Sequence, residues 1–239
     1  MGLFSWGRST GAFPSLQADM HSHLLPGVDD GSKDVKESLE LIGSLRQLGY
    51  RKLITTPHIY GELYPNTLES MENARGLLPE FDFPFRFAAE YFLDDYVEQI
   101  VKAGKPLLTI HENWVLVEIS FVQPPPDLDR RIFELQVGGY KPIMAHPERY
   151  PFWHGNKEIF HGLKERGVLL QVNLLSLIGY YGRPVMETAQ YLLREELVDL
   201  TGTDCHHQRH IEALRKGGRL LDKTLTPLLK KDKLLNPFL

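Results

Sequence analysis

The sequence predicts an α/β protein whose parallel strands form a closed or distorted barrel of about seven strands. Three observations support this fold class. Short apolar runs alternate with longer amphipathic segments along the chain, as in repeated β-α units. Several runs end in a histidine or a carboxylate, and the carboxyl ends of parallel strands meet at one edge of a sheet. The length of 239 residues fits one barrel, so we expect no second domain.

The helices follow from the spacing of apolar residues. In the range 34–48 these residues recur at helical spacing, and Gly49 supplies a C-terminal stop. Similar amphipathic segments occupy 67–78, 94–103, 127–137, 156–166, 184–197 and 209–222. Each is followed within a few residues by an apolar run or by the C-terminal tail, which completes the β-α alternation.

The apolar runs end in side chains that bind metal ions. The residues at these ends are His21, His23, His58, Glu90, Glu118, His146, Asp204 and His206. Side chains two residues apart in a strand face the same side. The side chains of His21 and His23 can therefore point the same way, and so can those of Asp204 and His206. Unpaired polar groups are costly to bury, and a metal centre would remove that cost. Histidine and carboxylate ligands from several strands indicate more than one ion of Zn, Mn, Fe or a similar metal.

Other residues of these types receive a structural interpretation. Cys205 has the opposite strand parity from its neighbours and is expected to pack in the core, as free cysteine usually does. The histidines outside the pattern are expected to be surface or capping residues, or to point away from the ligands: His111, His154, His161, His207 and His210. Glu112 and Glu148 lie near the motifs but outside the ends of the apolar runs, so they are left out of the predicted site.

Composition limits the partners of the chain. The net charge of -4, with both signs interspersed, argues against binding to nucleic-acid phosphates but allows a compact anionic substrate held by metal ions. A single cysteine excludes an internal disulfide and favours the cytoplasm. No apolar stretch approaches the roughly 20 residues of a membrane-spanning helix. Residues 1–17, which lack the apolar core of a secretory signal, are expected to be an arm that precedes a domain at 18–239.

The motif set resembles the polymerase and histidinol phosphatase (PHP) family. The closer resemblance is to its capsule-associated branch of bacterial manganese-dependent protein-tyrosine phosphatases. The motifs that carry it are DMHSHLLPGVDDG at 19–31, TTPH at 55–58, AHPERY at 145–150 and TDCH at 203–206. The resemblance runs from about residue 18 to about residue 220 and implies a distorted (β/α)7 barrel of the PHP type.

The resemblance also implies a site of three divalent ions, with Mn expected and Fe or Zn as alternatives. The implied ligand sets are His21, His23, Glu90 and Asp204 for the first ion, Glu90, Glu118 and His146 for the second, and Asp30, His58 and His206 for the third. Asp29 is the rival of Asp30, and the motif register favours Asp30. Arg149 matches an arginine that contacts phosphate in the family. Arg209 is a second candidate, although the residues after Asp204 depart from the usual Asp-x-His-Asn spacing.

The activity that the resemblance implies is hydrolysis of phosphotyrosine. The expected substrate is the phosphorylated tail of a bacterial tyrosine kinase linked to capsular or exopolysaccharide synthesis. The alternatives are a phosphoesterase acting on a small phosphomonoester such as histidinol phosphate or on a phosphodiester, and an inactive metal-stabilised scaffold that binds the kinase. A cysteine-based phosphatase is disfavoured because no Gly-rich turn follows Cys205. Apolar residues at 234–239 allow either self-association or docking of the tail onto the barrel.

Overall fold

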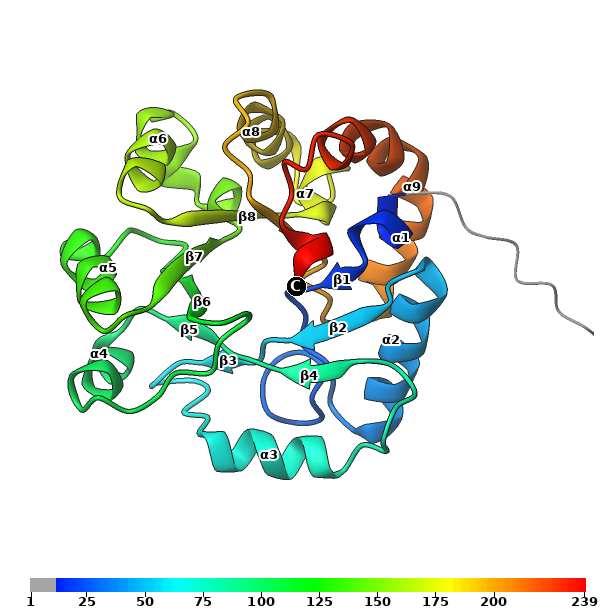
Figure 1. Cartoon of the computed structure of the whole chain (residues 1–239), viewed down its shortest axis with the longest axis horizontal. Coiled ribbons are helices and arrows are strands. Elements are labelled where there is room, and N and C mark those ends of the chain that lie inside the picture. Colours follow the sequence, from blue (N-terminus) through cyan, green and yellow to red (C-terminus); the bar gives the residue numbers. More distant parts are fainter. Residues whose placement is uncertain (1–11) are drawn as a thin grey trace, which may run out of the picture.

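Seven parallel staves form a barrel in the computed structural model, which describes residues 12–239 (Figure 1). A stave here is one of the parallel segments that form the wall of the barrel. Two of the staves are interrupted, so each of these two consists of two short strands. The staves are β1 (Ala18–Asp19), β2 with β3 (Lys52–Thr55 and His58–Ile59), β4 with β5 (Phe85–Phe87 and Glu90–Phe92), β6 (Trp114–Glu118), β7 (Lys141–Ala145), β8 (Leu169–Asn173) and β9 (Leu200–Gly202). All the strand pairings are parallel, which confirms the predicted α/β class.

The barrel is distorted where the interrupted staves bend. The strand order is β1-β2-β4 in one sheet and β3-β5-β6-β7-β8-β9 in the other. Across the break, the backbone N–H of Ala88 donates to Thr55 O at 2.8 Å and that of Glu90 donates to Pro57 O at 3.1 Å. The barrel closes between β9 and β1, where Asp204 N donates to His21 O at 2.7 Å. Two predicted metal ligands therefore lie on the closing seam.

The helices surround the barrel (Figure 1). They are α1 (Ala12–Leu16), α2 (Val35–Leu48), α3 (Leu68–Gly76), α4 (Asp95–Lys102), α5 (Leu128–Val137), α6 (Glu158–Glu165), α7 (Leu174–Leu177), α8 (Arg183–Arg194) and α9 (Gln208–Leu229), with 3-10 turns η1 (Pro147–Arg149), η2 (Pro151–Trp153) and η3 (Asn236–Phe238). Every predicted segment contains a helix, and α9 extends beyond the predicted end at residue 222. None of the helices in residues 12–239 is both long enough and apolar enough to cross a membrane.

Local sequence explains the limits of these helices. Asp34 precedes α2, and its carboxylate accepts a hydrogen bond from Glu37 N at 2.9 Å. Gly49 ends the same helix with a φ of 116°, a conformation that glycine adopts without strain. Thr67 and Ser70 form a reciprocal capping box at the start of α3. These caps hold the helices that support the ligand-bearing strands.

A small apolar core fills the inside of the barrel. Its buried members come from all the staves or the residues next to them: Met20, Ile54, Ala88, Ile110, Leu116, Ile143, Ala145, Leu169 and Leu200. Leu235 and Leu239 of the tail pack against this core, and the chain ends near the barrel axis (Figure 1). The tail therefore docks onto the barrel, as one of the two sequence-based alternatives proposed, and leaves the opposite end for the polar site.

Part of the predicted arm belongs to the packed structure. Phe13 and Leu16 of α1 are buried, and α1 packs against α9. Residues 1–11 of the arm lie outside the described part of the chain. The boundary between arm and domain at residue 17 remains a prediction. Helix α1, which lies before this boundary, packs against the domain.

Candidate metal centre

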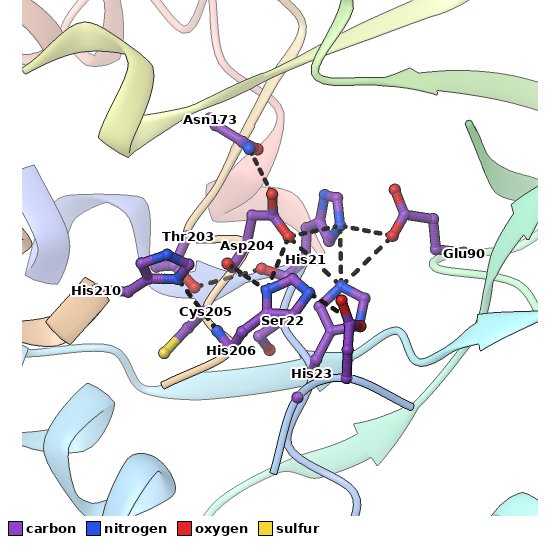
Figure 2. A network of polar contacts seen from close by, with 12 residues as sticks. His21, Ser22, His23, Glu90, Asn173, Thr203, Asp204, Cys205, His206 and His210 are labelled. Carbon is purple, nitrogen blue, oxygen red and sulfur yellow. Dashed lines mark hydrogen bonds and ion pairs between the residues drawn. The ribbon is translucent and has the colours of Figure 1, made fainter. Parts of the chain in front are cut away.

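The predicted ligand side chains converge at the carboxyl ends of the strands. Their donor atoms form four overlapping groups, each within 4.8 Å: His21, His23 and Asp204; His21, Glu90 and His146; His58, Glu90 and Glu118; and His23, Asp30, His58 and His206. Figure 2 shows His21, His23, Asp204 and His206 close together, with Glu90 reaching toward them from a separate strand. Because the groups share members, they form one continuous donor cluster.

The backbone is shaped to bring these residues together. His146 and Asp204 follow their strands with φ values of 33° and 49°, in the left-handed region that non-glycine residues rarely adopt. Such strain is concentrated at functional sites. Gly202 lies under the cluster, where an added Cβ would be 2.5 Å from the Cβ of His21. An added Cβ on Gly31 would be 2.3 Å from His23 O, so the loop before α2 can lie close to the site only with glycine there.

The donor spacing suits divalent cations. His21 Nε2 lies 3.1 Å from Glu90 Oε2 and 3.5 Å from His23 Nε2, and His23 Nε2 lies 3.4 Å from Asp204 Oδ1. Two ligands of one ion, each bound at about 2.1 Å, are separated by roughly 3.0–3.4 Å. His58 Nδ1 lies 2.9 Å from Glu118 Oε1 and 3.3 Å from Glu90 Oε2, but this buried nitrogen makes no hydrogen bond of suitable geometry with the described residues. These residues fit bound metal ions better than a network of hydrogen bonds.

Residues behind the cluster orient the histidine rings. Nδ1 of His21 lies 2.8 Å from Gln171 Oε1, and Nδ1 of His23 lies 2.7 Å from Asp29 Oδ2. Both contacts leave Nε2 of the histidine free to face the cluster. In metal sites, groups behind the ligands fix the histidine rings in the same way. Asp30 Oδ1 instead lies 3.5 Å from Nε2 of His58 and 3.5 Å from Nε2 of His206. The geometry thus separates the two aspartates, with Asp30 among the donors and Asp29 behind His23.

Strand β8 supplies orienting residues that the sequence analysis missed. Asn173 Nδ2 donates to Asp204 Oδ2 at 2.7 Å (Figure 2), and Gln171 Nε2 donates to Asn173 Oδ1 at 2.9 Å. The signal was an apolar run at 168–173 that also ends in polar residues. Neutral amides are not among the histidine and carboxylate ligands that the strand ends were expected to supply, so these two residues lay outside the predicted pattern.

Three carboxylates of the cluster, Glu90, Asp204 and Asp30, have pKa values lowered by their histidine neighbours. Burial alone would raise the pKa of Glu90, but the charges of His21 and His58 hold it well below its usual range. Burial opposes ionisation of Asp204 in the same way, and His21 and His206 outweigh it and lower its pKa. The hydrogen bond from His206 lowers the pKa of Asp30. Buried carboxylates at this density need compensating positive charge, which metal ions would supply.

Arg149 lies at the edge of the cluster. Its Nη1 donates to Asp204 Oδ2 at 2.7 Å, and its guanidinium lies 4.3 Å from the ring centre of Tyr181 and 4.9 Å from that of Phe121. Arg209 is exposed in the first turn of α9. The structure of residues 12–239 gives it no hydrogen bond or ion pair with the cluster, and its predicted role remains a prediction without geometric support.

Glu148, which the sequence analysis left out, supports the turn that carries Arg149. Its side chain is buried, and Oε1 accepts hydrogen bonds from Asn173 N at 2.9 Å and Ser176 Oγ at 2.7 Å. Burial raises its pKa. The available signal was its position next to Arg149, the residue predicted to bind phosphate. Because Glu148 lies in a turn after strand β7 and not at a strand end, the pattern of strand-end ligands did not include it.

The remaining residues mostly have the structural roles expected. Cys205 is fully buried, and burial raises the pKa of its thiol. His154 contacts Glu148 O, and His161 contacts the hydroxyl of Tyr191. His210 is buried and not a surface residue, and its Nδ1 accepts a hydrogen bond from His206 N at 3.2 Å, a capping contact just before α9 (Figure 2). It therefore packs behind a predicted ligand.

Comparison with known proteins agrees with this geometry. The family model described as capsular polysaccharide synthesis, CpsB/CapC, matches residues 17–226. The chain belongs to the CpsB/CapC family. This confirms the resemblance to the capsule-associated branch that the motifs indicated.

Relatives in the CpsB/CapC family carry phosphatase names. The tyrosine-protein phosphatase YwqE of Bacillus subtilis is 29% identical over 79% of this chain and 77% of its own length. The tyrosine-protein phosphatase CpsB of Streptococcus pneumoniae is 27% identical over 79% of this chain and 82% of its own. A solved structure from work on YwqE and CpsB, described as unique metal-dependent tyrosine phosphatases, superposes with a TM-score of 0.70 at 25% identity and covers 90% of this chain and 94% of that one.

Proposed function

We propose that this CpsB/CapC protein is a metal-dependent protein-tyrosine phosphatase. The observation that carries the proposal is the continuous cluster of nine histidine and carboxylate donors, with the guanidinium of Arg149 beside it. The names of the relatives and of the matching crystal structures support the same activity.

We propose that the cluster holds three divalent ions and that these are manganese, with iron or zinc accepted by the same ligand types. The proposed holders are the sets that the resemblance implies: His21, His23, Glu90 and Asp204 for one ion, Glu90, Glu118 and His146 for another, and Asp30, His58 and His206 for the third. The spacing of the donor atoms alone also groups His58 with Glu90 and Glu118, and His23 with Asp30, His58 and His206. When bound, the ions supply positive charge for a phosphate dianion and lower the pKa of a water that serves as nucleophile. The positive charge of three divalent ions exceeds the negative charge of the four carboxylate ligands, so the loaded site would stay electropositive.

Residues of the chain would bind and orient the phosphate. Arg149 uses Nη1 for Asp204, which leaves its other N–H groups for the non-bridging phosphate oxygens. Asp204 is itself fixed by Asn173, so the guanidinium is held in place before substrate arrives. A tyrosine phenolate has a parent pKa of about 10 and leaves more readily than an alkoxide, so hydrolysis needs little help from a general acid.

The proposed physiological substrate is the phosphorylated tail of a tyrosine kinase that controls surface-polysaccharide synthesis. Membership in a capsular polysaccharide synthesis family supports this choice. A small phosphomonoester such as histidinol phosphate is the alternative substrate at the same cluster.

The test compares three substrates on one metal-loaded preparation: a phosphotyrosine peptide, histidinol phosphate and single-stranded DNA. We expect hydrolysis of the peptide that stops on chelation and returns when the metal is restored. The acidic net charge of the chain gives no reason to expect DNA turnover. Hydrolysis of histidinol phosphate or DNA without hydrolysis of the peptide would overturn the proposed substrate class.

A further inference from the structure

Phe121 is a large apolar side chain placed beside the metal-type cluster. It follows strand β6 and Glu118, and 41% of its surface is exposed. Its ring centre lies 5.6 Å from that of His146, with an angle of 22° between the rings, and 5.3 Å from that of Tyr150. Isolated surface aromatics need no explanation. This one is fixed against a predicted ligand and still presents apolar surface to solvent.

The same ring lies next to the proposed phosphate-binding cation. The guanidinium of Arg149 is 4.9 Å from the ring centre of Phe121, and the ring of Tyr181 contacts it from 4.3 Å. The interaction with aromatic faces limits where Arg149 can turn. A positive group and an exposed apolar ring side by side suit an anionic ester whose other half is flat and apolar.

We propose that Phe121 contacts the phenyl ring of the substrate and so favours aryl over alkyl phosphate esters. This inference rests on the proposed phosphatase function and names the residue that selects its substrate. Aromatic pairs stack offset or edge to face, and such contacts add to the free energy of burying apolar surface.

The depth of the cluster supports this role. Glu118, three residues before Phe121 in the chain, and His146, whose ring packs against it, are both buried, so a phosphate bound to them would lie deeper than the partly exposed ring of Phe121. In phosphotyrosine the ring separates the phosphate from the peptide backbone. In phosphoserine a single carbon does so, and the backbone itself would have to come down to the level of Phe121. A partly exposed apolar ring beside buried ligands therefore favours an aryl ester, in which the distance from phosphate to backbone is longer.

Two further aromatic rings pack on predicted ligands, and one of them, Tyr150 beside His146, is fully buried. The other is Tyr64, which is partly exposed and whose ring lies 5.6 Å from that of His58 at an angle of 15°. It is a weaker candidate because it lacks the neighbouring guanidinium that lies 4.9 Å from the ring centre of Phe121. No cation is paired with Tyr64 among the contacts of residues 12–239.

The experiment measures inhibition by two unreactive phosphate analogues, phenylphosphonate and methylphosphonate, on metal-loaded protein. The variants are Phe121→Ala, Phe121→Tyr and the control Phe133→Ala, which removes a 63% exposed ring on helix α5. We expect Phe121→Ala to raise the inhibition constant of phenylphosphonate about tenfold and to leave that of methylphosphonate unchanged. Phe121→Tyr should restore the aryl preference, and Phe133→Ala should change neither constant.

Each other outcome overturns the role of Phe121. An equal loss for both analogues would mean that the ring acts only by holding Arg149 or His146. No loss for either would mean that the substrate ring lies elsewhere. Both results remain distinct from failure of the proposed function, which would appear as wild-type metal-loaded protein that does not hydrolyse a phosphotyrosine peptide.

Discussion

Glu90 is the residue on which the donor cluster is centred. Its Oε2 lies 3.1 Å from His21 Nε2, 3.4 Å from His23 Nε2 and 3.3 Å from His58 Nδ1, while Oε1 lies 3.1 Å from His146 Nε2. A carboxylate with both oxygens among histidines of different donor groups can join two ions. Its removal should therefore affect more than one bound metal.

We predict that Glu90→Gln lowers both metal content and activity. The variant should lose at least one ion per chain by elemental analysis, and kcat/KM on a phosphotyrosine peptide should fall at least about 100-fold, since even residues behind the ligands are worth 10–100-fold. Glu112→Gln is the matched control, because Glu112 is an exposed acid whose one ion pair within residues 12–239 is with His111. Full activity in purified Glu90→Gln protein would refute the bridging role.

Cys205 provides a second residue-level prediction, directed at the type of chemistry. Burial raises the pKa of the thiol, and the side chain faces the core cluster rather than the donors. Cys205→Ala should retain kcat/KM within about threefold, with a loss of stability of about 1 kcal/mol from the small cavity. Iodoacetamide should leave the folded wild-type protein active, measured against full inhibition by a chelator. Rapid inactivation by the thiol reagent would contradict a metal-based reaction.

At the scale of elements, the sequence predicted those helices and strands that are long enough to show a hydrophobic period. Helix α2 spans 14 residues and has both caps, so its period and limits were visible. Strands β3 and β5 have two and three residues. Pro57 marks the break before β3 because proline cannot donate to a strand ladder, but the break at Ala88 and Ala89 before β5 has no such mark in the local sequence. A pattern of period two needs more residues than these strands contain.

The site shows the same limit in a different form. Ligand types at strand ends could be predicted because buried charge requires compensation, and His21 and His146 were found in this way. Gln171 and Asn173 could not, since their role depends on the partners that β8 meets across the barrel. The apolar run that ends in these amides marks their position at the strand end, but it does not reveal which ligands they pair with.

Helix α1 carries a prediction at this scale. It has five residues, too few for an amphipathic period, yet Phe13 is buried with its ring edge to face on Tyr50 at 5.7 Å between centres. Phe13→Ala should lower the free energy of unfolding by about 3 kcal/mol, as large-to-small changes in packed cores do. Urea unfolding measures the change, with Phe133→Ala as the exposed control. A change below about 1 kcal/mol would show that α1 is not part of the cooperative core.

At the scale of the whole molecule, the seam between β1 and β9 must be held at both ends of the barrel. At the site end, His21 and Asp204 are joined by a backbone hydrogen bond and share one donor group. At the opposite end, the tail supplies Asn236, which lies 35 residues beyond Thr201 in the sequence. Closure of the barrel thus depends on a segment that no strand pattern would include.

Asn236 should therefore act as a long-range clamp whose loss destabilises the whole barrel. Its Nδ2 donates to Thr201 O at 2.7 Å and to Ala18 O at 3.2 Å, and its Oδ1 accepts from Thr201 N at 2.9 Å. Asn236→Ala leaves these buried backbone groups without partners, at a cost of about 1–3 kcal/mol for each unsatisfied group. We expect a loss of at least about 2 kcal/mol in urea unfolding, whereas Asn156→Ala, at an exposed position, should change little. Because the clamp lies at the far end from the donors, the folded variant should bind the same number of ions per chain as the wild type. Wild-type stability in Asn236→Ala would mean that the strands close the barrel without the tail.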